Sequence, residues 1–194
     1  MRKLTAGDYQ VMPWKNGGGV TTQLAVFPSG AGLDTFDWRI STAQVASEGP
    51  FSVFPGIDRS LAVIQGHGMV LTDADGECCR MGAGSAPFVF RGEQRIDAQL
   101  KDGPVVDFNV MTQRSVCSHV LEVTELHGTR HCTPQSDLML VYVAQGRGTA
   151  CGMHAGAGET LLVDWREESA IELSAVTPTL LCVAHIAFKE KRND

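Results

Sequence analysis

The sequence predicts an all-β fold, and two observations carry that prediction. Apolar residues alternate with period two in several short segments, whereas no helical period is sustained along the chain. Glycine-rich and polar turn signals separate these segments, and 21 of the 194 residues are glycine, which suits a fold with many tight turns. A chain of this length can form one large β domain or two small ones, and either sandwiches or barrels satisfy the pattern.

The alternation is clearest in two segments that are each predicted to be a strand. In FDWRIS, aromatic residues and isoleucine occupy one face, and Asp37, Arg39 and Ser41 occupy the other. In VVDFNVM, valine and phenylalanine oppose a face that carries Asp107 and Asn109. Both strands therefore combine an apolar face with an unusually polar one.

A weak internal repeat divides the chain into two halves. SLAVIQGHGMVL, from Ser60, parallels LMLVYVAQGRGTA, from Leu138, because each reads as an apolar strand, Gln-Gly-x-Gly and a second strand. Downstream, GAGSAPFVF resembles GAGETLLVD, and each half ends in a further apolar strand. This order of strands and glycine turns is the one found in cupin barrels. We predict an all-β bicupin, with two cupin-like β-barrel halves of the RmlC-like jelly-roll type at residues 1–115 and 116–194.

Charge and composition bear on the partners of the chain. The net charge of −6, without a cluster of Lys or Arg, argues against a nucleic-acid surface. The N-terminus lacks the apolar segment of a signal peptide, and no apolar run is long enough to span a bilayer. We expect a cytoplasmic protein with no nucleic-acid or membrane partner. A homodimer through sheet edges is compatible with a cupin fold, but nothing in the sequence fixes the oligomeric state.

The sequence predicts neither a metal centre nor another cofactor. The six cysteines form no C-x-x-C pair, and we expect them to be reduced. The H-x-H pair that metal-binding cupins usually present is absent, and His67 is expected in the turn between two glycines. His127 and His131 are four residues apart, but HGTRHCTP contains Gly128 and Pro134 and is predicted to be a loop. Catalysis that requires a cupin iron or manganese is therefore not expected.

Polar residues that suit a binding site gather in the first half. The candidates are Trp14, Lys15, Asn16, Gly17, Arg39, Ser41, Arg59, Asp107 and Asn109. If the polar strand faces line a barrel lumen, cations and amides converge on one cavity. If those faces meet water, they are the ordinary polar sides of half-buried strands, and the sequence slightly favours this second interpretation.

Each candidate also has a structural explanation. Lys15 and Arg59 could grip a carboxylate, although Arg59 could instead pair with a neighbouring acid. Trp14 could stack on a planar ligand or plug the end of a core. Asn16 could bind ligand or cap its loop, and the glycines from Gly17 onward could present N–H groups inward as an anion-binding nest. No nucleophile–base motif appears, so no catalytic residue is predicted.

Four blocks of the first half resemble those of the HutD/Ves family, a group of small bacterial bicupins. They are MPWKNGGGVTTQL, FDWRIST, GPFSVFPGIDRSL and DFNVMTQR, and they occur in the family's order between Met12 and Arg114. The resemblance implies a bicupin without a metal and with a polar pocket in its N-terminal half. HutD proteins are associated with histidine utilisation and are thought to sense a small metabolite, whereas Ves-type members are linked to cold or stress response.

Together these features predict a HutD/Ves-like binding or sensing protein rather than an enzyme. Its expected partner is a small carboxylate metabolite, such as urocanate or formylglutamate. Two alternatives stay open. One is a protein-interaction bicupin that acts in stress response. The other is a metal-free enzyme that uses Asp107 or Lys15 as the acid–base group on a small acid.

Overall fold

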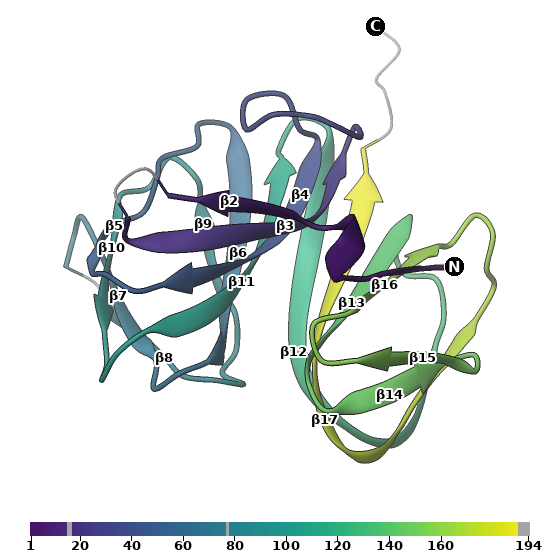
Figure 1. The fold of residues 1–194 in the computed structure, drawn as a ribbon. Helices are drawn as coiled ribbons and strands as arrows, with labels where there is room; N and C mark the ends of the chain where they lie inside the picture. Colours follow the sequence, from purple (N-terminus) through teal and green to yellow (C-terminus); the bar gives the residue numbers. More distant parts are fainter. Residues whose placement is uncertain (15–16, 77, 190–194) are drawn as a thin grey trace, which may run out of the picture. The chain divides into compact units, whose positions relative to one another are not determined.

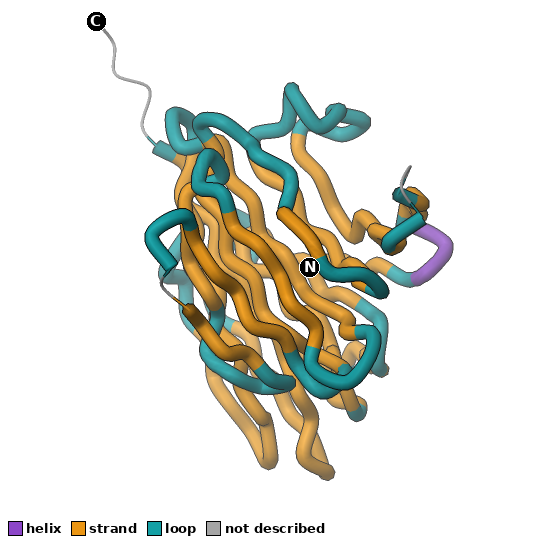
Figure 2. Tube along the Cα trace, turned by 90° about the vertical axis from the view of Figure 1, so that its left-hand side faces the viewer, coloured by secondary structure: helices purple, strands orange, loops and turns teal. Residues whose placement is uncertain are grey.

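The computed structural model describes residues 1–14, 17–76 and 78–189 (Figure 1). Strands, drawn in orange in Figure 2, make up most of the described chain, and the short 3₁₀ helix η1 (Ala6–Asp8) appears in purple. The predicted all-β fold is therefore confirmed. Within the described ranges, no helix is both long and apolar enough to cross a membrane.

The chain divides into two compact units that differ from the predicted halves at the N-terminus. The N-terminal unit is Tyr9–Arg114, and the C-terminal unit combines Met1–Asp8 with the chain from Ser115 onward. The first residues join the second unit because β1 (Arg2–Leu4) pairs antiparallel with β16 (Thr160–Asp164). A three-residue strand is too short for its alternation to be recognised in a sequence.

The N-terminal unit contains two sheets (Figure 1). Buried apolar side chains from both sheets form one core. The larger sheet has the order β2-β3-β4-β11-β6-β9, and the smaller has the order β5-β10-β7-β8. The larger sheet comprises β2 (Gln10–Pro13), β3 (Gly19–Phe27), β4 (Trp38–Val45), β11 (Val105–Gln113), β6 (Ile57–Gln65) and β9 (Phe88–Arg91). The smaller comprises β5 (Gly49–Pro50), β10 (Ile96–Leu100), β7 (Met69–Asp73) and β8 (Cys78–Met81). Val63, Met69 and Ile96 are among the fully buried side chains of this core.

The C-terminal unit repeats this strand order in one seven-stranded sheet. Its remaining strands are β12 (Cys117–Cys132), β13 (Leu138–Gln145), β14 (Arg147–Ala150), β15 (Met153–Gly156) and β17 (Ile171–Phe188). The succession β13 to β16 matches β6 to β9, and Gly66 and Gly146 lie in the equivalent first turns, both with positive φ. The internal repeat read from the sequence therefore corresponds to a structural repeat.

The prediction of a loop at HGTRHCTP is wrong. Strand β12 continues to Cys132, and residues 128–132 pair with residues 171–175 of β17. The strand accommodates Gly128, which has φ +86°, because the pairing register shifts there in a β-bulge. Pro134 lies beyond the end of the strand, where it costs no ladder hydrogen bond.

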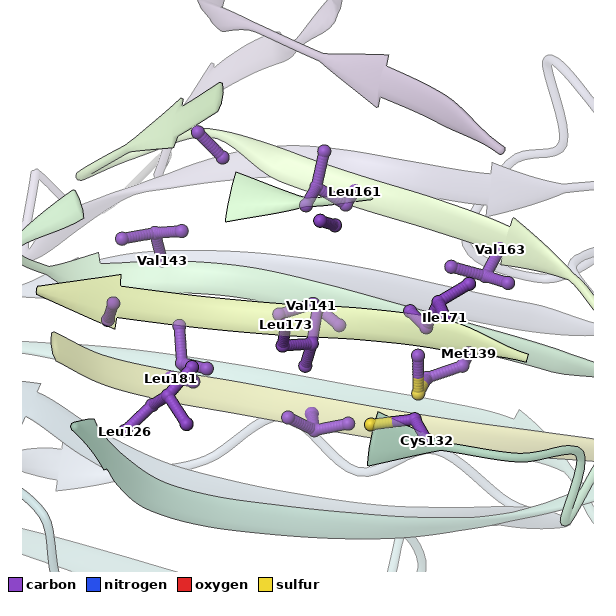
Figure 3. Close-up of a cluster of buried hydrophobic side chains, with 14 of the residues drawn as sticks. Leu126, Cys132, Met139, Val141, Val143, Leu161, Val163, Ile171, Leu173 and Leu181 are labelled. Carbon is purple, nitrogen blue, oxygen red and sulfur yellow. The ribbon is translucent and has the colours of Figure 1, made fainter. Parts of the chain in front are cut away.

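The interior of the C-terminal unit is filled by hydrocarbon. Figure 3 shows side chains from several strands converging on one cluster, including Met139, Val141, Leu161 and Leu181. Most members of the cluster are aliphatic, and each is almost completely buried. Burial of this kind stabilises a fold by about 25 cal/mol per Å² of apolar surface. The corresponding interior of the N-terminal unit also contains buried polar and charged side chains.

Candidate functional site

Three adjacent strands of the larger N-terminal sheet carry the candidate residues in register. Arg39 on β4 lies opposite Met111 on β11, and Met111 lies opposite Arg59 on β6. In the next rows, Ser41 lies opposite Asn109 and Ala43 opposite Asp107. Because side chains alternate along a strand, these positions project from one face of the sheet. The polar residues of segments far apart in sequence therefore meet on a single surface.

That surface lines a cavity of about 620 Å³ inside the N-terminal unit. The candidate residues in its wall are Trp14, Arg39, Ser41, Arg59, Asp107 and Asn109. The five on strands are no more than 7% exposed. Ligand sites for small molecules usually enclose about 300–1,000 Å³. The polar faces thus line a lumen, and the interpretation in which they meet water is wrong.

The sequence favoured water because an antiparallel sheet normally buries one face only. Here the opposite face of the same strands is also buried, and it carries Trp38, Ile40, Phe108 and Val110. Strands buried on both faces leave no water-exposed side on which the polar residues could lie. The apolar half of the alternation was read correctly, and Trp38 is a core residue as expected.

The guanidinium of Arg59 is held by two neutral acceptors. Its Nη1 donates to the carbonyl oxygen of Ser52 at 3.1 Å, and its Nη2 donates to Oδ1 of Asn109 at 3.1 Å. Its Nε is buried and has no hydrogen-bond partner among the described residues. Burial lowers the pKa of Arg59 to about 10, so the side chain is still a cation at neutral pH.

Three phenylalanine rings surround this cation. The guanidinium carbon of Arg59 lies 4.7 Å from the centroid of Phe90, 5.4 Å from Phe54 and 5.7 Å from Phe51. Cation–π contacts of this length are favourable but do not neutralise the charge. Sequence reasoning missed this cage. Its only signal was the pair of phenylalanines in GPFSVFPG shortly before Arg59.

Arg39 has similarly few polar contacts. Its Nε donates to Oε1 of Gln23 at 2.7 Å, and its Nη1 lies 3.9 Å from the thioether sulfur of Met111, which is a weak acceptor. Burial lowers the pKa of Arg39 from its ordinary value. Met111 was not predicted to belong to the site.

Asp107 supplies the carboxyl group of the cavity. Its Oδ1 accepts a hydrogen bond of 2.5 Å from Nδ2 of Asn109, the same amide whose Oδ1 accepts from Arg59. Burial raises the pKa of Asp107 to about 7, against the opposing effects of the Arg59 charge and the Ala43 peptide N–H. The amide thus connects a cation to an acid that is close to half-protonated at neutral pH.

Two arginines outside the cavity, Arg114 and Arg130, differ because acids neutralise them. Nε of Arg114 lies 2.7 Å from Oδ1 of Asp58, and Arg130 makes two hydrogen bonds of 2.7 and 3.0 Å to the carboxylate of Glu122. Since Asp58 pairs with Arg114, it is not the partner of its neighbour Arg59. Among the described residues, neither cavity arginine has an acid oxygen within 4.0 Å. The cavity wall therefore contains two buried cations that are not in direct ion pairs with its acids.

The segment that carries the three glycines contributes the Trp14 ring to the cavity wall. Trp14 lines the cavity and packs against the core, and its Nε1 donates to Oγ1 of Thr21 at 2.8 Å. Gly17 has φ +72°, does not line the cavity, and donates its N–H to the Trp14 carbonyl at 3.0 Å. That N–H is thus committed to a turn. Lys15 and Asn16 lie outside the described residues.

Metal-ligating side chains (histidine, cysteine and carboxylates) do not form a metal site in the described ranges. No group of three or more of them is placed to hold a metal ion there. His67 is exposed in the turn after β6, as expected, and its Nδ1 lies 3.0 Å from the Asp102 carbonyl oxygen.

The raised pKa of Asp107 leads to a testable effect on stability. Between pH 4 and 7 the folded protein keeps a proton that the unfolded chain releases, so the free energy of unfolding falls as pH rises. Asp107→Asn removes this penalty. We expect its stability relative to wild type to rise by on the order of 2 kcal/mol between pH 4.5 and 7.5, measured by urea unfolding. The exposed Asp97→Asn is the matched control, and parallel profiles for Asp107→Asn and wild type would refute a buried acid.

Two solved structures resemble the chain over nearly its whole length. A conserved protein of unknown function from Pseudomonas aeruginosa PAO1 is 29% identical with a TM-score of 0.86, covering 96% of this chain and 98% of the other. HutD from Pseudomonas fluorescens SBW25 is 30% identical with a TM-score of 0.82, covering 97% and 98%. A pirin from Escherichia coli and an oxalate decarboxylase from Lactobacillus farciminis, at 12% and 10% identity and TM-scores of 0.62 and 0.66, share the fold alone.

Sequence relatives match a smaller part of the chain. An uncharacterised 21.2 kDa protein in the hutC 3′ region of Pseudomonas putida is 42% identical over 111 residues, which are 57% of either chain. Protein Ves of Escherichia fergusonii is 34% identical over 122 residues, which are 61% of this chain and 62% of that one. The chain thus spans about three fifths of the length of these two curated relatives.

Fold and site together define a bicupin whose N-terminal unit has a polar cavity with two buried arginines. The family model for HutD matches residues 6–181. The chain belongs to the HutD family, as the resemblance of the four blocks implied.

Proposed function

We propose that the N-terminal cavity binds a small carboxylate and that the chain is a non-catalytic binding or sensing protein of histidine utilisation. The observation that carries this proposal is the pair of buried arginines, Arg39 and Arg59, without an acid partner among the described residues. Burial of an ion without a directly paired counter-ion costs several kcal/mol, and a bound carboxylate would supply the opposite charge.

The chemistry of the wall suits a carboxylate. A guanidinium can donate two parallel hydrogen bonds to the two oxygens of a carboxylate. Arg39 uses its Nε for Gln23, and its Nη groups have only the thioether contact among the described side chains. Ser41 and Asn109 add neutral polar groups, and Trp14 and the phenylalanines add flat apolar surface for the rest of the ligand.

The relatives support the choice of pathway. The P. putida protein is named for its position beside hutC, and the P. fluorescens protein is named HutD. Urocanate and formylglutamate are therefore the first ligands to examine, and a cavity of about 620 Å³ is large enough for either. A cytoplasmic location belongs to the same proposal, because these metabolites arise inside the cell.

Thermal stabilisation tests the proposal directly. A ligand at 100 times its Kd should add about 2.7 kcal/mol to the free energy of unfolding. For a protein of this size, we expect the melting temperature to rise by roughly 5–10 °C. The matched control is the amide of each acid, which has the same shape without the charge and should give little shift. Flat melting curves for urocanate, formylglutamate, succinate and acetate would contradict the proposal.

One observation favours a second candidate function. Asp107 combines a place in the cavity wall with a pKa of about 7, which suits a general acid or base at neutral pH. The chain would then be an enzyme that acts on the bound acid. Proton NMR of the two pathway acids incubated with the protein would reveal turnover, and its loss in Asp107→Asn would promote this candidate over simple binding.

A further inference from the structure

Asp107 occupies an unusual electrostatic position in the cavity wall. The carboxyl group is 2% exposed, and its neighbours across the sheet, Ala43 on β4 and Val63 on β6, are apolar. Its contact with the nearest cation runs through the Asn109 amide, because no oxygen of Asp107 lies within 4.0 Å of the Arg59 guanidinium. The acid is thus close enough to Arg59 to feel its charge, but it is not paired with it.

Among the described residues, the other charged groups of the cavity are two arginines and one glutamate. Arg59 projects from β6 and Arg39 from β4, and Glu48, which follows β4, is exposed in the lining. The described lining residues from β3, β5 and β10 have no ionisable side chain. A ligand carboxylate held by the arginines would therefore become the dominant negative neighbour of Asp107.

We infer that Asp107 takes up one proton from solvent when a carboxylate binds in this cavity, so that anion binding and protonation of Asp107 are coupled. This inference rests on the proposed function. A second negative charge beside a buried carboxylate disfavours its ionised form. Once protonated, the Asp107 carboxyl gains an O–H donor, which can hydrogen-bond to an oxygen of the ligand. The charge balance is one bound anion and one bound proton for each site filled.

Coupling of this kind has a defined pH dependence. Well below pH 7, Asp107 is protonated before and after binding, so no proton is exchanged and affinity is constant. Well above pH 7, the empty site has released its proton and the filled site retains it, so affinity should fall by about tenfold for each pH unit. Between pH 7, where the empty site is about half-protonated, and pH 8.5, affinity should fall by roughly 15-fold.

Isothermal titration calorimetry with formylglutamate tests the inference, because both carboxyl groups of this probe are ionised throughout pH 6–8.5. Titrations at pH 7.5 in buffers of different ionisation enthalpy should show uptake of about 0.5–1 proton per ligand. Asp107→Asn should take up no proton and should bind with an affinity that is flat from pH 6.5 to 8.5. Asp97→Asn, an exposed change of the same kind on β10, should keep the wild-type profile.

Each contrary outcome has one meaning. Wild-type binding without proton uptake and with flat affinity would overturn this inference and leave the proposed function standing. The same pH dependence in a folded Asp107→Asn variant would assign the proton to another group and would also overturn it. If that variant does not fold, ¹³C NMR titration of the Asp107 carboxyl in wild type, with and without formylglutamate, must show a pKa that rises on binding. No binding of formylglutamate, urocanate, succinate or acetate at any pH would overturn the proposed function and, with it, this inference.

Discussion

Replacing Arg59 with methionine is expected to abolish carboxylate binding while the protein stays folded with nearly unchanged stability. Removing one partner of a desolvated charge pair costs about 2–5 kcal/mol of binding, or roughly 30-fold to several thousandfold in Kd. The folded protein loses two hydrogen bonds, to Ser52 and Asn109, but it also loses a buried charge. These effects oppose one another, so we expect the free energy of unfolding to stay within about 2 kcal/mol of wild type.

The combination of results identifies the role of Arg59. Binding is measured by calorimetry with formylglutamate and urocanate, and stability by urea unfolding of the empty protein. Arg130→Met is the matched control, because that guanidinium is already neutralised by Glu122 in the C-terminal unit. It should bind both acids as wild type does. If Arg59→Met instead binds normally and unfolds several kcal/mol more easily, Arg59 is a structural residue and the cavity has another purpose.

Replacing Gly19 with alanine should cause a large loss of stability. An added Cβ would collide with the carbonyl oxygen of Gln44 on the paired strand and would lie 3.0 Å from two carbons of the Trp14 ring. The backbone oxygen cannot move without disturbing the β3–β4 ladder. We expect a loss of about 3 kcal/mol or more, at the upper end of the cost of overpacking. Trp14 should also move, and its fluorescence should change.

Gly32→Ala is the control that separates this steric overlap from the general effect of replacing a glycine with alanine. Gly32 lies in an exposed turn of the same unit, has no positive φ, and its added Cβ would meet only Thr35 Oγ1 at 3.9 Å. Gly32→Ala should be neutral within about 0.5 kcal/mol. Urea unfolding of the two variants provides the comparison. Equal stabilities would show that β3 and β4 are less closely paired beside Trp14 than the structure indicates.

Much of the fold could be predicted from the sequence because strand periodicity and glycine turns are local signals. The repeat that begins at Ser60 and Leu138 marks structurally equivalent strands, and the boundary near Ser115 is visible as the end of a repeat. Two features were not predictable. β1 joins a partner more than 150 residues away, and the bulge at Gly128 lets a glycine continue a strand that its local sequence would end.

The sequence indicated several residues of the candidate site, but it did not indicate how they are arranged in space. Alternation placed Arg39 with Ser41, and Asp107 with Asn109, and the gathering of polar residues in the first half added Trp14 and Arg59. Whether those residues met water depended on the other face of the sheet, which is a tertiary property. Gly17 was predicted to be a site residue, but it does not line the cavity. Glycine suits this position because the backbone turns there with φ +72°. Gln23 and Met111 contact Arg39, and Phe90 contacts Arg59, because of the register between neighbouring strands. A local sequence pattern does not report that register.

The pairing of β1 with β16 has a consequence for how the protein is made and handled. Strand β1 is synthesised more than 150 residues before its partner β16, so it stays unpaired while the whole N-terminal unit is being made. A variant that begins at Tyr9 would lack β1 and would leave β16 as an exposed edge strand, with unpaired peptide groups at Leu161 and Leu162. Exposed edge strands pair with strands of other molecules, so the trimmed protein should aggregate more readily. It would still contain all the residues that line the N-terminal cavity.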